Sequence, residues 1–331
     1  MEMCATSKNI LITGHKSPDG DAIGSTLALH HYLRAKRIES TVLVPDDYPK
    51  FLHWLPGNQE VLVHDHNIAK GNELITKADL IFTLDYNHLS RVGNMTSAMQ
   101  NSSAKMVMID HHQQPADYAE VTISDTTSCS TAQMVYQFIA ASGDEDLVTT
   151  EMAECLYCGI ITDSGSFRFG SVNSETHDIA AKLIAKGLDH AKVHRQIYDT
   201  NRMDKLKLVG HALGNKLQVL VNGRVAIIDL SIKELEEHNY HAGDTEGLVN
   251  QALSIEGVNC AVFIREGKNL VKLSFRSKGH FDVNQLARYH FKGGGHMNAA
   301  GGGVANSSLE AVLSQVKSVL ETYEKELDYE F

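Results

Sequence analysis

The chain has 331 residues, 43% of them hydrophobic and 21% charged, which is ordinary for a globular protein and long enough for two domains that each bury a core. Its formal net charge of −11 argues against a large basic surface and thus against long nucleic acid as a partner. A small anionic substrate stays compatible with this charge, because divalent cations and a few basic residues can dominate the field of a pocket.

The N-terminus and the cysteines indicate the compartment. Residues 1–8 are polar and no apolar segment follows them, so we expect no signal peptide. The longest apolar runs are strand-sized, which predicts no membrane association. The five cysteines are an odd number scattered along the chain, and Cys155 and Cys158 lack the second pair that a zinc site would need. These features predict a cytoplasmic protein with buried structural thiols.

The first half of the chain alternates short apolar runs with helical patterns, which predicts an α/β domain built on a parallel sheet. In such sheets ligands bind beyond the carboxyl ends of the strands. Side chains that directly follow a strand are therefore candidates for a site. We expect strands over residues 8–13, 41–44, 80–84 and 105–109, and helices over 21–36 (with Asp21 available as N-cap), 130–142, 149–162 and 174–186.

A charged helical stretch over 191–214 is interpreted as a connector between a first domain, 1–190, and a smaller α/β domain, 215–331. In the second domain the dipeptide Asn222-Gly223 separates two strand-like runs, which is a strong signal for a two-residue hairpin. We expect strands over residues 216–221, 224–230, 259–265 and 270–275, the last two forming a second hairpin, and helices over 245–253, 282–289 and 308–325.

The segment after the first predicted strand carries three ligand-type side chains. The turn Ser17-Pro18-Asp19-Gly20 can aim His15, Asp19 and Asp21 into one crevice. Taken alone, Asp19 could be a turn former and Asp21 a helix cap.

Three further clusters stand where a regular element ends. Asp85 follows one predicted strand, Asp110-His111-His112 follows the next, and Asp163 ends a predicted helix. An Asp–His pair also supplies the hydrogen bond that orients a metal-bound imidazole. Asp85 by itself could be an ordinary loop aspartate, and Asp163 could belong to a helix C-terminal turn. Their joint occurrence at the ends of elements favours a common site.

These clusters contain carboxylates and imidazoles and no thiolates. That donor set favours a hydrolytic divalent cation such as Mn²⁺, with Mg²⁺, Co²⁺ or Zn²⁺ as substitutes. There are too many donors for one ion with open positions, but they suit two cations that share a carboxylate. The chemistry indicated is phosphoester hydrolysis.

The glycine-rich segment 293–303 is interpreted as a phosphate-binding loop, because glycines let bare backbone N–H groups approach an anion. It matches neither a dinucleotide fingerprint nor a P-loop. An arginine at the end of the preceding predicted strand could bind phosphate in a bidentate manner. The candidate substrate-binding residues are Gly294, Gly295, His296, Asn298 and Arg276.

Together these clusters resemble the DHH/DHHA1 phosphoesterase family, which is named for the tripeptide at Asp110-His111-His112. The resemblance covers nearly the whole chain, with the four motifs at the clusters described above and the GGGH motif of the DHHA1 domain at Gly293–His296. In size and layout the chain is most similar to the branch of bifunctional oligoribonucleases and phosphoadenosine-phosphate phosphatases.

The resemblance implies two divalent cations, usually Mn²⁺. It assigns His15, Asp19 and Asp85 to one cation and Asp21, Asp85, His111 and Asp163 to the other. Asp85 would bridge the two ions. Asp110 and His112 would support the ligands without binding the metal, or would contact the substrate phosphate. The candidate catalytic residues are therefore Asp85, Asp110 and His112.

The implied activity is hydrolysis of short RNA or of linear or cyclic dinucleotides to 5′-mononucleotides, together with removal of the 3′-phosphate of adenosine 3′,5′-bisphosphate. Arg276, His296 and the glycine segment would hold the other end of the nucleotide, and a homodimer is expected because family members are often dimers. Two alternatives stay open at this point, a manganese-dependent inorganic pyrophosphatase and a nucleotide-sensing module without catalysis.

Overall fold

The computed structural model describes residues 1–330 and divides the chain into two compact units, Met1–Thr200 and a second that begins at Asn201. The division falls inside the segment 191–214 that was predicted as a connector. Among the described residues, none of the helices is long and apolar enough to cross a membrane.

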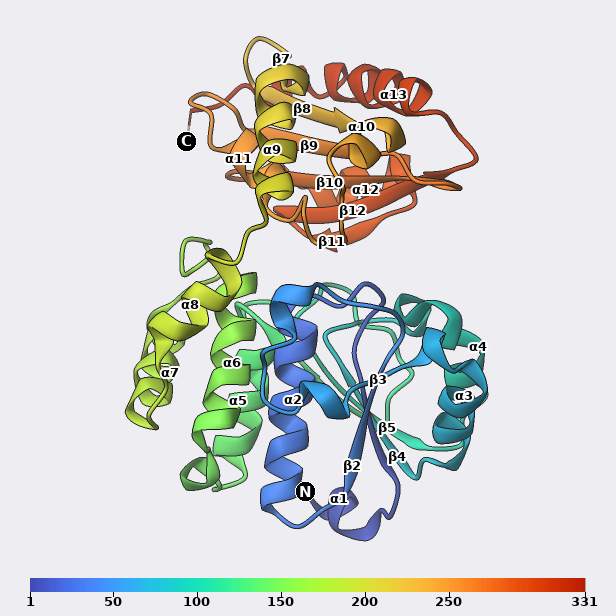
Figure 1. Cartoon of the computed structure of the whole chain (residues 1–331), viewed down its shortest axis with the longest axis vertical. Coiled ribbons are helices and arrows are strands. Elements are labelled where there is room, and N and C mark those ends of the chain that lie inside the picture. The colour runs from blue at the N-terminus through green and yellow to red at the C-terminus, as the bar shows by residue number, and fades with distance from the viewer. Residues whose placement is uncertain (331) are drawn as a thin grey trace. The chain divides into compact units, whose positions relative to one another are not determined.

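The first unit is built on a six-stranded sheet in which every pair of neighbouring strands is parallel (Figure 1). The strand order is β3-β2-β1-β4-β5-β6, so the direction in which successive strands are added reverses between β1 and β4. The predicted parallel sheet is thereby confirmed, although β3 and β6 were not predicted. The strands are β1 (Ile10–Thr13), β2 (Ser40–Val44), β3 (Leu62–Val63), β4 (Leu80–Leu84), β5 (Lys105–Asp110) and β6 (Val121–Ser124).

Helices cover both faces of this sheet. On one face Ile12, Phe82 and Ile109 pack against α2, α5 and α6, and on the other face Leu11 and Ile81 pack beneath α3 and α4. Burial on both faces explains why the strands read as continuous apolar runs rather than as alternating ones. The helices are α1 (Glu2–Thr6), α2 (Gly20–Ala35), α3 (Ile68–Lys77), α4 (Thr96–Gln100), α5 (Thr131–Ala141), α6 (Thr150–Asp163), α7 (Ser174–Ala185) and α8 (His190–Tyr198).

The N-cap of α2 was predicted wrongly. The carboxylate of Asp19, not that of Asp21, caps the helix, because its Oδ1 accepts hydrogen bonds from the backbone N–H groups of Asp21 and Ala22 at 3.0 and 3.1 Å. Both aspartates satisfy the sequence preference for an N-cap. The start of α2 at Gly20 leaves the Asp21 side chain to point into the protein, where it is buried.

The predicted connector is not one continuous helix. It breaks after α8 at the polar residues 199–202 and resumes as α9 (Met203–His211). Val193 of α8 belongs to the core of the first unit, whereas Leu208 of α9 belongs to a core of the second. Short polar residues compete with the helix backbone for hydrogen bonds, which favours a break at this position.

The second unit has a sheet of order β11-β12-β10-β9-β8-β7, in which only the β8–β9 pair is parallel. Helices α12 and α13 pack on one face, and α9 and α11 pack on the other. Both predicted hairpins, β7–β8 and β9–β10, are confirmed. The further elements are β7 (Gln218–Leu220), β8 (Val225–Leu230), α10 (Ile232–Glu237), α11 (Leu248–Leu253), β9 (Cys260–Arg265), β10 (Leu270–Ser277), α12 (Val283–Phe291), β11 (Gly294–His296), β12 (Ala299–Ala305), α13 (Leu309–Glu321) and α14 (Glu324–Leu327).

The glycine-rich segment is not a loop, as predicted, but the hairpin β11–β12. A Cβ atom on Gly293 would lie 2.0 Å from the carbonyl oxygen of Gly301, and one on Gly295 would lie 2.4 Å from that of Ala299. The backbones therefore approach more closely than any side chain allows. Glycine is depleted from strands in general, so local preference concealed a hairpin that tertiary packing stabilises.

Candidate metal centre and active site

The predicted site residues of the first unit emerge at the carboxyl ends of β1, β4 and β5, on both sides of the point where the strand order reverses. His15 follows β1, Asp85 follows β4, and β5 ends at Asp110. The loop after β1 and the loop after β4 diverge at such a reversal, which leaves a crevice between them. Asp19 is the N-cap of α2, Asp21 lies in the first turn of that helix, and Asp163 is the last residue of α6.

The first group of side chains is His15, Asp19 and Asp85, whose ligand atoms all lie within 4.8 Å of one another. Nε2 of His15 is 3.6 Å from Oδ2 of Asp19 and 3.3 Å from Oδ2 of Asp85. Nδ1 of His15 lies 2.9 Å from the backbone carbonyl oxygen of Lys16. Because a carbonyl only accepts, Nδ1 carries a proton, so Nε2 is the ring nitrogen that could bind a cation once its own proton has left.

The second group is centred on His111. Its Nε2 lies 3.3 Å from Asp163 Oδ2, 3.5 Å from Asp85 Oδ1 and 3.8 Å from Asp21 Oδ2. Nδ1 of His111 is 3.1 Å from the carbonyl oxygen of Ser128, which orients this imidazole in the same way as that of His15.

The two groups share Asp85 through different oxygens, Oδ2 toward His15 and Oδ1 toward His111. Two donors on one cation at about 2.1 Å each stand about 3.0–3.4 Å apart in octahedral or tetrahedral geometry. The observed separations of 3.3–3.8 Å are close to these values. Within residues 1–330, no lysine or arginine forms an ion pair with Asp21, Asp85 or Asp163. The donor set therefore fits two cations with one shared carboxylate.

The pKa shifts of the carboxylates also favour two cations at this site. Burial, and then the neighbouring carboxylates of Asp85 and Asp163, raise the pKa of Asp21 well above its usual value. Burial likewise raises the pKa of Asp163 to about 6. Burial opposes ionisation of Asp85 as well, but hydrogen bonds from His111 and His15 outweigh it and hold the pKa of Asp85 well below its usual value. So many buried carboxylates repel one another unless cations lie between them.

The backbone at Asp85 is strained, with φ of 64° in the left-handed region that non-glycine residues avoid. Its N–H still donates to the carbonyl oxygen of Ile109 at 3.1 Å, so the chain turns sharply while it stays attached to β5. Strain of this kind costs about 1–3 kcal/mol and is concentrated at functional sites.

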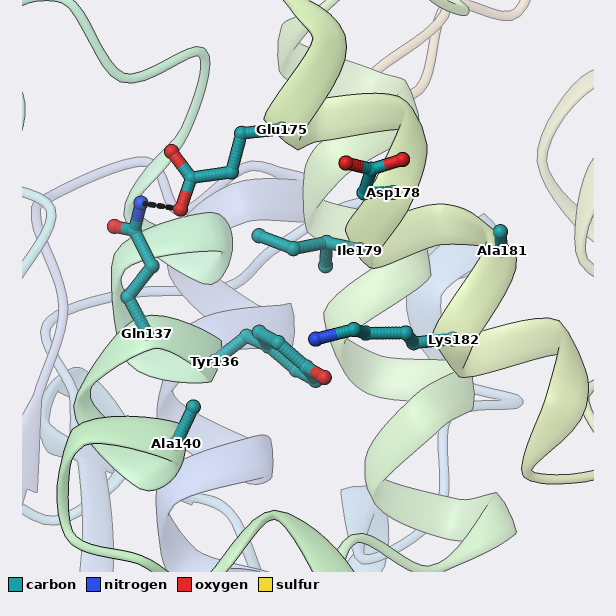
Figure 2. Close-up of a pocket in the computed structure, with 8 residues that line it drawn as sticks. All are labelled: Tyr136, Gln137, Ala140, Glu175, Asp178, Ile179, Ala181 and Lys182. Atoms are coloured by element: carbon teal, nitrogen blue, oxygen red, sulfur yellow. Dashed lines mark hydrogen bonds between the residues drawn. The ribbon is translucent and has the colours of Figure 1, made fainter.

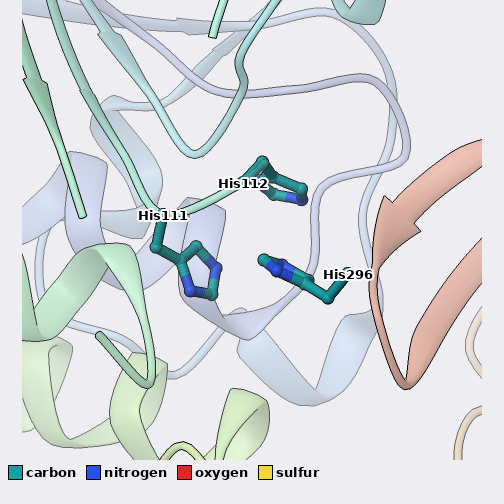
Figure 3. Close-up of side chains that lie close together, drawn as sticks. All are labelled: His111, His112 and His296. Atoms are coloured by element: carbon teal, nitrogen blue, oxygen red, sulfur yellow. The ribbon is translucent and has the colours of Figure 1, made fainter. Parts of the chain in front are cut away.

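Asp110 and His112 form a hydrogen-bonded pair next to the two groups of candidate ligands. His112 Nδ1 lies 2.7 Å from Asp110 Oδ1, and the backbone N–H of His112 donates to Asp110 Oδ2 at 3.1 Å. Figure 3 shows the rings of His111 and His112 beside each other at the end of β5, with ring centroids 5.1 Å apart. Asp110 is fully buried and His112 Nδ1 is 3.8 Å from Asp85 Oδ1, so the pair adjoins the shared carboxylate.

Three of the predicted substrate-binding residues lie on one face of the second sheet. Arg276 is the penultimate residue of β10, at the end of the strand as predicted, and it pairs with Ala299, which in turn pairs with His296 of β11. Directly paired residues point to the same face, and residues two apart do too, so Gly294 shares this face while Gly295 does not. The small side chain of Ala299 separates the arginine from the imidazole.

Asn298 and Gly295 are engaged within the unit. The Asn298 amide donates to Ser277 Oγ at 2.9 Å and to the Gly279 carbonyl at 3.0 Å, and the Gly295 N–H donates to Asn284 Oδ1 at 2.9 Å. These bonds attach the middle of β11 and the turn that follows it to neighbouring elements. Asn284 was not predicted, because a buried asparagine inside a helix carries no signal that a sequence pattern detects.

A separate groove of about 520 Å³ lies between α5 and α7 (Figure 2). Among its polar side chains, Gln137 donates to Glu175 at 2.9 Å, and Lys182 pairs with Glu145 at 3.2 Å. The lining contains none of the predicted site residues: Tyr136, Gln137, Ala140, Glu175, Asp178, Ile179, Ala181 and Lys182. All five cysteines are buried and free, as was predicted for Cys155 and Cys158.

Comparisons with known proteins decide the family. The model of the DHH family N-terminal domain matches residues 9–160, and the model of the DHHA1 domain matches residues 222–322. The crystal structure of an exopolyphosphatase-related protein from Bacteroides fragilis is 37% identical with a TM-score of 0.92, and the match covers 99% of this chain and 96% of that one. The chain belongs to the DHH family.

Two curated relatives are named as bifunctional enzymes. The bifunctional oligoribonuclease and PAP phosphatase NrnA of Bacillus subtilis is 27% identical, over 95% of this chain and 96% of its own length. The protein of the same name from Thermus thermophilus is 29% identical, over 96% of this chain and 90% of its own length. The predicted DHH/DHHA1 membership, the two-domain α/β fold and the enzyme class, a phosphoric ester hydrolase, are thereby confirmed.

Proposed function

We propose that this chain is a two-metal phosphodiesterase that hydrolyses short oligoribonucleotides or dinucleotides to 5′-mononucleotides, and that it also removes the 3′-phosphate of adenosine 3′,5′-bisphosphate. The observation that carries the proposal is the sharing of Asp85 between the two ligand groups. The names of the two NrnA relatives support the same pair of substrates.

In this proposal His15, Asp19 and Asp85 hold one divalent cation, and Asp21, Asp85, His111 and Asp163 hold the other. Mn²⁺ is the preferred ion, with Mg²⁺ and Co²⁺ as alternatives. When bound, such a pair of cations activates water at neutral pH and neutralises charge on the phosphoryl oxygens.

The chain's own groups supply orientation and a proton. Asp110 accepts from Nδ1–H of His112, so Nε2 of His112 is the atom that faces the substrate, and it either steadies the phosphate or protonates the leaving oxygen. In the second unit Arg276 and His296 share one face and would bind the other end of the nucleotide.

The test is a panel of pApA, a short oligoribonucleotide, cyclic di-AMP, adenosine 3′,5′-bisphosphate and inorganic pyrophosphate in Mn²⁺, with products resolved by chromatography. Mononucleotide release by the wild type should be abolished in Asp85→Ala and only weakened in Arg276→Ala. Asp178→Asn, a substitution at an exposed position on α7, is the matched control and should act like the wild type.

Three results would contradict the proposal. Undiminished activity of Asp85→Ala would exclude the shared carboxylate. Faster hydrolysis of pyrophosphate than of any nucleotide would indicate a pyrophosphatase. Tight nucleotide binding without turnover would indicate a sensor.

A further inference from the structure

Residues 128–131, which lead from the β6–α5 loop into the first turn of α5, contact three of the proposed metal ligands, although none of these residues was predicted for the site. The carbonyl oxygen of Ser128 lies 3.1 Å from Nδ1 of His111. The backbone N–H of Thr131 donates to Asp21 Oδ2 at 2.6 Å. The hydroxyl of Thr131 donates to Asp85 Oδ1 at 3.1 Å. Thr131 therefore bonds to two carboxylates at once, one from its backbone and one from its side chain.

The start of α5 explains why the backbone N–H groups point at Asp21. Ser130 caps the helix, with its hydroxyl accepting from the N–H of Gln133 at 3.0 Å, so Thr131 is the first helical residue. The first N–H groups of a helix have no partner inside it and carry partial positive charge. Those of Thr131 and Ala132 donate to Oδ2 and Oδ1 of Asp21, the second at 2.8 Å.

The hydroxyl of Thr131 has a different role from its N–H. Thr131 and Asp85 are both buried, so the bond between them is shielded from water. Asp85 also has the strained backbone described above, which does not by itself determine how the carboxylate is rotated. A donor on Oδ1 fixes that rotation, so that Oδ1 faces His111 while Oδ2 faces His15.

We propose that Thr131 is a positioning residue that holds the shared carboxylate of Asp85 at a set distance and rotation from Asp21. The spacing of the two cations would then depend on one hydroxyl. This inference rests on the proposed two-metal function. The hydroxyl does not titrate near neutral pH and contacts neither a cation nor the substrate in this scheme. Its loss should act through metal binding rather than through a proton transfer.

The test compares Thr131→Val, which keeps the shape and the backbone N–H but lacks the hydroxyl, with Thr131→Ser, which restores it. Mn²⁺ affinity is measured by calorimetry without substrate, and the spin coupling between two Mn²⁺ ions is measured by electron paramagnetic resonance. Loss of a group that orients a metal ligand costs about 10–100-fold in metal affinity. We expect that loss, and a weaker coupled signal, in Thr131→Val but not in Thr131→Ser.

The matched control is Thr26→Val. Thr26 is also a fully buried threonine, but its hydroxyl donates only to the carbonyl of Ile23 in its own helix, so wild-type affinity is expected. Circular dichroism of the metal-free proteins checks folding, and Thr131→Ala replaces Thr131→Val if the latter does not fold.

Wild-type Mn²⁺ binding by a folded variant without the hydroxyl would overturn the inference, as would a serine variant as weak as the valine one. If the wild type itself bound no pair of Mn²⁺ ions, the proposed function would fail first, so the two failures are distinguishable.

Discussion

Nδ1 of His112 lies 2.7 Å from Oδ1 of the fully buried Asp110, at the carboxyl end of β5. Because the carboxylate accepts from Nδ1–H, it sets the tautomer of the His112 ring. This relationship separates the proposed role of the tripeptide's first and third residues from that of His111, which lies among the proposed metal ligands.

Replacement of Asp110 by asparagine removes the carboxylate that accepts from Nδ1–H of His112 and allows the wrong tautomer. We expect kcat to fall by about 10²–10⁴-fold, the usual contribution of a positioned proton donor, with a smaller change in KM. Single-turnover kinetics measure the change, and circular dichroism checks that the variant folds. An unchanged kcat in the folded variant would contradict a positioning role for Asp110.

Metal binding should strengthen as pH rises. Burial disfavours protonated His15, but Asp19 and Asp85 outweigh burial and raise the pKa of His15 well above its usual value. The pKa of His111 is raised in the same way, chiefly by Asp85 and Asp163 against burial. A group with a raised pKa holds its proton at neutral pH, and a cation must displace it. Calorimetry in buffers of different ionisation enthalpy over about pH 6–8 should show proton release, with affinity rising up to about tenfold per pH unit for each proton displaced.

Asp163→Asn should stabilise the metal-free protein and weaken the metal-bound one. Because burial raises the pKa of Asp163 to about 6, its contribution to stability is full below its unfolded value of 3.8 and is lost as pH rises through about 6. At neutral pH the Asp163 carboxylate is ionised, and its burial costs free energy of folding. The neutral asparagine removes that cost. Since 33% of the side chain is exposed, the gain should be small, about 1 kcal/mol or about 2–4 °C in Tm. Thermal unfolding with EDTA and with Mn²⁺ should give opposite orders of stability for the variant and the wild type.

The glycine hairpin should tolerate alanine at one position and not at another. A Cβ on Gly293 would lie 2.0 Å from Gly301 O, whereas one on Gly301 itself would lie 3.7 Å from the nearest atom, Leu273 O. We expect Gly293→Ala to destabilise the second unit by about 2–3 kcal/mol and Gly301→Ala to be nearly neutral. Urea unfolding measures the difference. Mn²⁺ binding by the first unit should survive in both variants, and its loss in Gly293→Ala would contradict this expectation.

Much of the fold could be predicted because its signals are local. Apolar runs place β1, β4 and β5 within a few residues, and Asn222-Gly223 places the β7–β8 hairpin. Where two local signals compete, prediction fails. Asp19 and Asp21 are equally good caps, and only the turn before the helix decides between them. In the glycine hairpin, close contact between the two backbones overcomes the low strand preference of glycine. No sequence pattern reveals such a contact.

By itself the sequence determined the kinds of donor available and their places at the ends of elements, because periodicity and residue chemistry are read over a few neighbours. Only the tertiary structure decided which donors meet, because that depends on the strand order and on bonds such as that between Asp21 and Thr131, 110 residues apart. A threonine hydroxyl or a backbone N–H has no distinctive pattern in a sequence. It becomes specific only when folding excludes water and leaves a buried carboxylate as its partner.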